Sequence, residues 1–362
     1  MKKIGILFGV ENSFPSALVE RINALCSAPD VRARTLRLRS GQALAQQPAG
    51  GQRYDSHGAD EVRAEFVLTG AVNLDRAPDY AVIIDRISHD VPFYRAWLKQ
   101  AALAGTAVIN NPFRASADDK FLNYAVARRL GVAVPPTVLL PHKELPNQTS
   151  DKSMRNLEFP LDWESVFAVV GEHGFLKPIH GGGWRDVHEV RGREEFFRAY
   201  DRSRDLCMAV QKAVEYTEYF RCYVVGQKAV RIMHYDPRKP HAERYAQILA
   251  RATTFQARKL FKRMHDDAVK LCRALGYDLN SVEFAVENGI PYAIDFLNPV
   301  PDADVHSVGA AHFDWIVEQV AELAIARAKG ARRAGELRWA ALLGAEAGEA
   351  KRSLKMKAKG LH

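Results

Sequence analysis

The sequence has 362 residues, of which 47% are hydrophobic and 26% are charged, and its formal net charge at pH 7 is +8. This length exceeds what one ordinary hydrophobic core supports and predicts two or three domains of a globular protein. No apolar run reaches the ~18 residues that a membrane-spanning helix needs, and the N-terminus lacks a small-residue cleavage site, so we expect a cytoplasmic protein without a membrane partner. The four cysteines stand singly and lack zinc-type spacing, which favours reduced core thiols over disulfides or metal ligands.

The excess positive charge is concentrated at the C-terminus. Residues 331–362 contain eight Lys or Arg and three Glu, so they carry +5 of the total net charge of +8. A solvated basic tail accounts for this pattern, with an interaction with an acidic partner as the alternative. Nucleic acid is therefore not expected as a partner of the rest of the chain.

Residues 1–112 are predicted to form a small open-sheet α/β domain of the Rossmann-like type. Strands and helices alternate in this part, with strands at 3–8, 80–88 and 107–110 and helices at 16–25 and 92–103. A stretch rich in Gly, Gln and Ala follows the first helix without a usable period. We interpret it, at 39–60, as a surface insertion or disordered loop that interrupts the domain without ending it.

A well-marked helix is predicted at 116–130, where the second domain begins. Ser116 is the expected N-cap with Asp119 three residues later, and Gly131 follows the last turn. Lys120 lies near the start of this helix. An extended segment, a loop and a short helix are then expected at 132–141, 142–160 and 161–172.

Residues 174–187, GFLKPIHGGGWRDV, combine a strand, a glycine loop and a returning strand that begins at Trp184. Lys177 stands at the end of the first strand, and the loop contains Gly181, Gly182 and Gly183. Glycines let backbone N–H groups approach an anion, and the lysine adds a fixed positive charge, so the pattern predicts a phosphate site. No helix pattern follows and no Ser or Thr succeeds the lysine, which excludes a Walker loop and the dinucleotide fingerprint. An ordinary β-turn between two strands is the alternative.

A strand that carries Gln211 is predicted next, at 208–214, followed by a hairpin of two strands at 221–225 and 228–235. We then expect a strongly basic loop at 236–244 and a long helical region from there to about residue 275.

The next segment is predicted to be a half-buried hairpin, because apolar and polar residues alternate along both of its strands. A two-residue Asn-Gly turn would put the two apolar rows on opposite faces, whereas a three-residue loop pairs Val286 with Ile290 and puts both rows on one face. We therefore expect the longer loop, which also brings Glu283 nearly opposite Asp295 on the other face. Two like charges so placed repel unless a cation lies between them.

These two carboxylates and the side-chain carbonyl of Asn298 are hard oxygen ligands of the kind that suits Mg²⁺. The alternative is a solvated face that carries two unrelated acids.

Four blocks of the chain, taken in order, resemble the ATP-grasp superfamily. The likeness is closest to its glutamate-adding peptide ligases, of the ribosomal-protein-modification type, and it extends to glutathione synthetases and D-alanine–D-alanine ligases. The blocks lie at 85–137, at 174–187, at 209–226 (AVQKAVEYTEYFRCYVVG) and at 282–299 (VEFAVENGIPYAIDFLNP). Each block alone is a weak signal, but four in the correct order and spacing are specific. The resemblance implies an α+β ATP-grasp domain at 113–330, with subdomains at about 113–207 and 208–330.

Carried over residue by residue, the resemblance implies one nucleotide site. Lys120 and Lys177 would contact the ATP phosphates, and the loop of Gly181, Gly182 and Gly183 would close over them. Adenine would be read by the backbone of Gln211, Lys212, Ala213 and Val214, and the ribose hydroxyls would be held by Glu218. Two Mg²⁺ ions, with Mn²⁺ as the alternative metal, would be bound by Glu283, Asp295 and Asn298. Catalytic roles would fall to Lys177, Arg221 and Arg238.

The chain departs from the family pattern at two places. The usual acid-x-Asn triplet is one residue longer here, because two residues separate Asp295 from Asn298. The arginine and the Asn and Gly-Gly residues expected after the hairpin are replaced by HYDPRKPHAER, in which Arg238 is the best substitute. Ordinary alternatives also stay open: Glu218 as a surface acid or as a partner of Arg221, and Gln211 as an edge residue.

The resemblance implies an ATP-dependent ligase that joins a carboxylate to an amine, or to a thiol, through an acyl phosphate and releases ADP and phosphate. The implied partners are a small-molecule carboxylate and amine, or a peptide or protein acceptor, and a homo-oligomer is compatible with the sequence. Two other classes remain open: a nucleotide-binding protein without ligase activity, and a small-molecule kinase on the same site.

Overall fold

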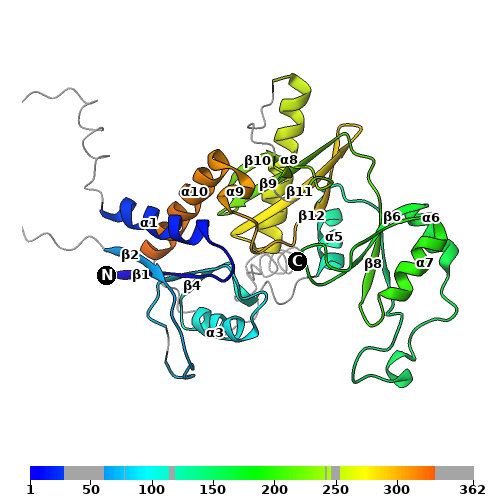
Figure 1. The fold of residues 1–362 in the computed structure, drawn as a ribbon, viewed down its shortest axis with the longest axis horizontal. Coiled ribbons are helices and arrows are strands. Elements are labelled where there is room, and N and C mark those ends of the chain that lie inside the picture. Colours follow the sequence, from blue (N-terminus) through cyan, green and yellow to red (C-terminus); the bar gives the residue numbers. More distant parts are fainter. Residues whose placement is uncertain (28–60, 77, 114–118, 241–242, 246–252, 331–362) are drawn as a thin grey trace, which may run out of the picture. The chain divides into compact units, whose positions relative to one another are not determined.

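The computed structural model describes residues 1–27, 61–76, 78–113, 119–240, 243–245 and 253–330. The predicted insertion, the predicted N-cap Ser116 and the predicted basic tail lie outside these ranges. The described chain forms two compact units (Figure 1). The first consists of Met1–Pro112, Ala303–Val305 and the described residues from Phe313 on. The second consists of Phe113–Asp302 and His306–His312. No helix in the described ranges is long and apolar enough to cross a membrane.

The first unit is built on a parallel four-stranded sheet in the order β2-β1-β3-β4. Trp97 and Leu98 of one helix pack with Ile83 and Val108 of the sheet in the core of this unit. The α/β order agrees with the sequence, but the edge strand β2 was missed although its residues alternate between apolar and polar. The elements are β1 Lys2–Leu7, α1 Ser13–Ser27, β2 Val62–Phe66, β3 Val82–Asp85, α3 Pro92–Leu103 and β4 Ala107–Ile109.

Two helices end the described chain, α9 Val305–Val308 and α10 Ala310–Lys329. From Phe313 on, α10 belongs to the first unit, where Glu318 pairs with Arg21 of α1. The sequence placed residues up to 330 in the second domain. Nothing in the local pattern of α10 records that it returns to the first unit.

The second unit contains two antiparallel sheets. The first has the order β5-β8-β6-β7, and α6 and α7 lie on one of its faces (Figure 1). Leu176 and Val210 point to that face and pack with Phe167 and Phe196 of the helices. Because side chains alternate along a strand, Lys177 and Gln211 point to the opposite face. The elements are β5 Thr137–Leu140, the 3-10 helix η1 Asp151–Met154, α6 Trp163–Val170, β6 His173–Pro178, β7 His188–Arg191, α7 Gly192–Arg202 and β8 Met208–Lys212.

The second sheet has the order β10-β9-β11-β12. Helices α5 and α8 pack with one of its faces through a large core, in which Phe220 and Phe284 of the sheet meet Tyr124 and Met264 of the helices. The elements are α5 Lys120–Arg129, β9 Glu218–Val225, β10 Ala229–His234, α8 Phe255–Leu275, β11 Leu279–Glu287 and β12 Ile290–Asp295.

Helix α5 begins later than predicted. Its N-cap is Asp119, whose side chain accepts a 2.7 Å hydrogen bond from the Leu122 N–H, and Lys120 is therefore the first helical residue. Gly131 follows the helix with φ +74°, as the sequence predicted.

The turn between β11 and β12 corrects the sequence prediction. Glu287 pairs with Ile290, so the turn has two residues, Asn288 with φ +52° and Gly289 with φ +75°. Both residues are left-handed, as a type I′ turn requires. The predicted three-residue loop and the pairing of Val286 with Ile290 are wrong.

A β-bulge in β12 nevertheless places Asp295 opposite Glu283, as the sequence predicted. The register shifts between the pair of Phe284 with Ala293 and the pair of Glu283 with Asp295, so that Ile294 is the extra residue. Ala293 and Phe296 both reach the core, three residues apart instead of two. The bulge thus turns Asp295 to the face opposite the core, where it lies across from Glu283.

Candidate functional site

Lys177 is a buried cation that no carboxylate of the described residues contacts directly. Its Nζ donates a 2.8 Å hydrogen bond to Oε1 of Gln211 and lies 4.9 Å from the ring centroid of Tyr124. Burial lowers the pKa of this lysine to about 8, and the charge of Asp295 opposes that shift while Lys120 adds to it. The positive charge is held in place by neutral groups and by charges at longer range.

Gln211 holds Lys177 from the neighbouring strand. It is 2% exposed, and its Nε2 donates to Oγ1 of Thr137 at 2.9 Å. Its strand β8 lies between β5 and β6, so the alternative of an edge residue is wrong. The next two residues give their backbone N–H groups to the sheet, Lys212 to Pro136 and Ala213 to His173, and Val214 lies beyond the end of β8.

Lys120 connects α5 to the glycine loop. Its side chain is buried and donates to the carbonyl of Gly181 at 2.5 Å, while its backbone N–H donates to Ile179 at 3.0 Å. Gly181 and Gly183 have φ +93° and +68°. A Cβ at any of the three glycines would meet nothing within 4 Å, so the backbone conformation, not crowding, favours glycine at Gly181 and Gly183. The returning strand begins at His188, later than the predicted Trp184.

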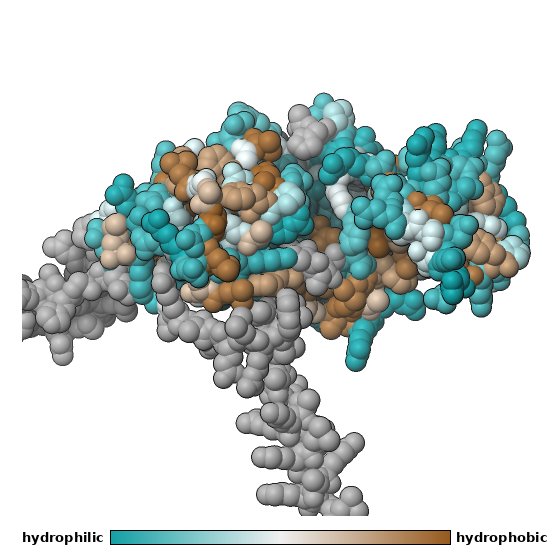
Figure 2. Space-filling view, turned by 90° about the horizontal axis from the view of Figure 1, so that it is seen from below, coloured by the Kyte–Doolittle hydropathy of each residue, from teal (hydrophilic) through white to brown (hydrophobic). Residues whose placement is uncertain are grey.

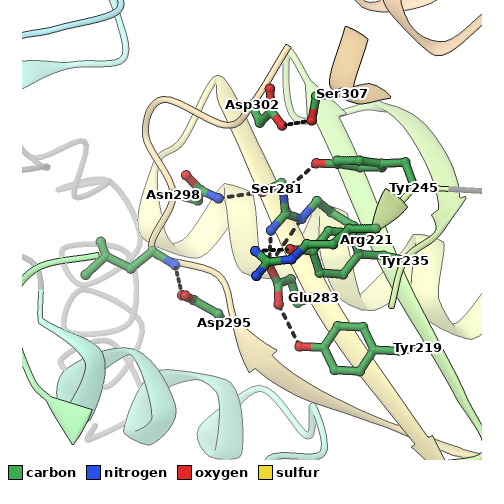
Figure 3. Close-up of polar contacts among 12 residues, drawn as sticks. Tyr219, Arg221, Tyr235, Tyr245, Ser281, Glu283, Asp295, Asn298, Asp302 and Ser307 are labelled. Carbon is green, nitrogen blue, oxygen red and sulfur yellow. Dashed lines mark hydrogen bonds and ion pairs between the residues drawn. The ribbon is translucent and has the colours of Figure 1, made fainter. Parts of the chain in front are cut away.

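Glu283 is held by two side chains of β9 (Figure 3). Arg221 donates to Oε1 through Nε at 3.1 Å and through a still closer Nη2, and the hydroxyl of Tyr219 donates to Oε2 at 2.6 Å. The side chains of Arg221 and Glu283 are each 11% exposed. The alternative pairing of Arg221 with Glu218 is therefore wrong.

Two tyrosines that the sequence did not single out enclose Arg221. Its guanidinium lies 4.1 Å from the ring centroid of Tyr235 and 5.4 Å from that of Tyr245, and Nη1 donates to the Tyr245 hydroxyl. Figure 3 shows the guanidinium between these rings and the Glu283 carboxylate. The available sequence signal was strand alternation, because Tyr235 follows two residues after Met233, the pairing partner of Arg221, and therefore lies on the same face.

Asp295 and Asn298 lie beside this pair. The half-buried Asp295 accepts a 3.3 Å hydrogen bond from the Leu297 N–H, and Asn298 donates through Nδ2 to Oγ of Ser281 at 2.8 Å. Asn280 fixes the chain between them, because its side chain donates to the Phe296 carbonyl and accepts from the Asn298 N–H.

The charges of four predicted site residues act on one another. Burial and the neighbouring Glu283 raise the pKa of the Asp295 carboxyl, and Lys120 and Lys177 oppose this rise. The second unit therefore brings both predicted phosphate lysines and both predicted metal-binding acids into one neighbourhood.

Two further predicted site residues, Glu218 and Arg238, are exposed to solvent. Glu218 is exposed at the start of β9. Arg238 is exposed as well; it pairs with Asp236 at 3.0 Å and lies 4.9 Å from the ring centroid of Tyr216.

The donor set suits a hard cation only in part. Among the described residues there is no group of three or more His, Cys, Asp or Glu side chains that could hold a metal. The carboxylates of Glu283 and Asp295 and the carbonyl of Asn298 are oxygen donors of the type that Mg²⁺ prefers. Oδ2 of Asp295 accepts no hydrogen bond from the described residues and is open to such an ion, whereas both oxygens of Glu283 already accept hydrogen bonds.

No family model and no curated protein matches this sequence. Solved structures do match it. D-alanine–D-alanine ligase from Bacillus anthracis in complex with ATP is 14% identical, with 91% of this chain and 97% of that chain covered and a TM-score of 0.55. The ATP-grasp ligase PsnB in complex with the precursor peptide PsnA2 and AMPPNP is 14% identical, with coverage of 90% and 98% and a TM-score of 0.53. An ATP-grasp RimK domain protein from Sphaerobacter thermophilus DSM 20745 is 15% identical, with coverage of 89% and 99% and a TM-score of 0.55. The chain has the ATP-grasp fold, as the sequence predicted.

Proposed function

We propose that this protein is an ATP-dependent ligase that joins a carboxylate to an amine through an acyl phosphate. The observation that carries the proposal is the meeting of two buried lysines, Lys120 and Lys177, with the carboxylates of Glu283 and Asp295 in one part of an ATP-grasp fold. Buried cations next to an open glycine loop favour a polyphosphate ligand, and the acids favour its metal complex.

Each of these residues has a distinct task in the proposed reaction. Lys177 offsets the charge that spreads over the transferring phosphoryl oxygens, and Gln211 and Tyr124 keep its ammonium in position. Lys120 fixes the glycine loop, whose backbone donors would cover the phosphates. Asp295 and the Asn298 carbonyl would hold Mg²⁺, which supplies electrophilic stabilisation of the phosphates when bound.

The chemistry needs no side-chain nucleophile. A carboxylate oxygen of the substrate attacks the γ-phosphorus and the bond to ADP breaks; the amine then attacks the acyl carbon, phosphate leaves, and the amine loses a proton. The structurally similar D-alanine–D-alanine ligase and PsnB support this class, the first by a small-molecule and the second by a peptide substrate. We infer either a small carboxylate and amine or a peptide acceptor for this protein.

A nucleotide-binding protein without ligase activity is the second candidate. It is favoured by one observation, the engagement of both oxygens of Glu283 by Arg221 and Tyr219, which leaves fewer metal ligands than phosphoryl transfer commonly uses.

Hydroxylamine distinguishes the two functions, because it traps an acyl phosphate as a hydroxamate whatever the natural amine is. The purified protein would be incubated with ATP, Mg²⁺, hydroxylamine and a panel of amino acids and dicarboxylates. A ligase gives hydroxamate and ADP with at least one carboxylate, and Asp295→Asn gives neither. ATP binding without hydroxamate across the panel would favour the inactive binder, and a stable phosphorylated alcohol would identify a kinase.

A further inference from the structure

The hydrogen bonds of Glu283 occupy most of the positions at which a metal ion would bind. Oε1 accepts from two nitrogens of Arg221, and Oε2 accepts from Tyr219 at 2.6 Å. Three of the about four lone-pair positions of this carboxylate are therefore taken, and both positions on Oε1 are taken by charge-assisted hydrogen bonds. A divalent cation could bind Glu283 through both oxygens only by displacing Arg221.

The surroundings of Arg221 oppose such a displacement. The guanidinium is packed near the rings of Tyr235 and Tyr245 and donates to the hydroxyl of Tyr245. The side chain is 11% exposed, so leaving Glu283 would break a buried ion pair. Removing one partner from a buried pair is strongly destabilising, since the remaining charge is left uncompensated.

Asp295 differs from Glu283 although the two lie opposite one another. In the part of the chain that the structure describes, Asp295 accepts one long hydrogen bond, from the Leu297 N–H at 3.3 Å, and no arginine contacts it. Asn298 directs its Nδ2 to Ser281, which leaves its carbonyl oxygen as the atom available to a cation. One cation position therefore remains on the Asp295 side of the pair.

We propose that the guanidinium of Arg221 replaces one of two divalent cations, so that this protein holds a single metal ion, on the Asp295 side, when ATP is bound. The proposal rests on the proposed function insofar as it requires ATP binding. It makes Arg221 a fixed positive charge beside the phosphates and a positioning group for Glu283.

Counting bound Mn²⁺ by electron paramagnetic resonance tests this proposal without measuring turnover. The native protein would be saturated with a non-hydrolysable ATP analogue and titrated with Mn²⁺, and free Mn²⁺ would be read from its sharp signal. We expect saturation at one ion per nucleotide complex. Saturation at two ions would overturn the proposal and leave the ligase function standing, whereas failure to bind the analogue at all would overturn both.

Arg221 variants give an independent count. Arg221→Met removes the guanidinium charge but keeps most of the side-chain volume. Glu283 then becomes available to a metal ion, and we expect two Mn²⁺ ions per complex. Arg221→Lys keeps a charge and should stay at one ion. Arg258→Met, at an exposed arginine of α8, is the control and should also stay at one. If Arg221→Met also binds one ion, the proposal is wrong; if that variant does not fold, the native count decides.

Discussion

The ammonium group of Lys177 donates a 2.8 Å hydrogen bond to the side-chain carbonyl of Gln211, which is itself fixed by Thr137. A neutral acceptor holds the lysine in place without cancelling its charge. This buried charge is available to an anionic ligand. Burying it lowers the stability of the ligand-free protein, and binding of an anion would offset that loss. The pair is therefore better suited to binding than to stability.

Replacing Lys177 by Met should weaken ATP binding by roughly 10- to 100-fold, because a charge-assisted hydrogen bond is worth about 1.5–3 kcal/mol. Adenosine, which lacks phosphates, should bind with little change. Calorimetric titration with both ligands measures the difference. Equal ATP affinities of the native protein and the variant would remove Lys177 from the phosphate site.

The same variant should fold with a melting temperature close to that of the native protein. The pKa of Lys177 is lowered from 10.5 to about 8, so burial of its charge costs about 3 kcal/mol at neutral pH. Methionine avoids this cost but leaves the buried Gln211 carbonyl without its donor, which costs about 1–3 kcal/mol. Differential scanning calorimetry should show near-cancellation of these effects; a large loss of stability would mean that Lys177 mainly supports the fold.

ATP affinity should depend on pH through Lys177. The lysine is charged below its pKa of about 8, and ATP phosphates attract only the charged form. Above about pH 8, binding must first take up a proton, so the dissociation constant should rise by up to about tenfold per pH unit. Titrations at pH 7, 8 and 9 on the native protein and on Lys177→Met check this, and the variant should show a flatter profile. A flat profile in the native protein would contradict the prediction.

Asp295→Asn should stabilise the ligand-free protein slightly while removing metal-dependent ATP binding. The pKa of Asp295 is raised by burial and by Glu283, so its ionised form costs stability at pH values above that pKa, and the neutral amide avoids the cost. Thermal melts with and without Mg²⁺ and ATP show both effects. Asp151→Asn, at an exposed acid of η1, is the control and should change neither. A lower melting temperature for Asp295→Asn would show that Asp295 is a structural residue.

Arg238→Ala should leave the fold and ATP affinity unchanged. Arg238 is exposed and its partner Asp236 is partly exposed, and ion pairs at the surface contribute about 0–1 kcal/mol. If Arg238 replaces the family's missing arginine, the variant should lose hydroxamate formation at unchanged ATP affinity. Arg244→Ala, a second arginine of the same loop, provides the comparison. Full activity of Arg238→Ala would assign the residue to the surface.

The sequence predicted the parts of the site that depend on local chemistry. The glycine loop, Lys177 at a strand end and Lys120 at a helix start are each visible in a few consecutive residues. The environment of Arg221 was not predictable in this way, because Tyr235 and Tyr245 come from separate segments and meet it only in the folded sheet.

The β11–β12 hairpin shows how a correct pairing can follow from a wrong register. The prediction used one rule, that both apolar rows face the core, and the long turn satisfied it. In the structure the row of Ile290 and Tyr292 leaves the core face, whereas Ala293 and Phe296 are buried in the core and Leu297 packs against it. A bulge carries no signature in a single sequence, so Asp295 was placed opposite Glu283 through two errors that cancelled.

The bulge at Ile294 also determines which length change this hairpin tolerates. Regular pairing continued from Phe284 and Ala293 would place the residue directly after Ala293 across from Glu283. Deleting Ile294 would therefore remove the bulge, keep the Asp295 carboxylate opposite Glu283 and leave Phe296 on the core side. A library of single-residue deletions in β12 should recover folded chains at the bulge in preference to the positions around it, and the number of residues from the turn to the acid can differ by one between related chains while the carboxylates stay in place.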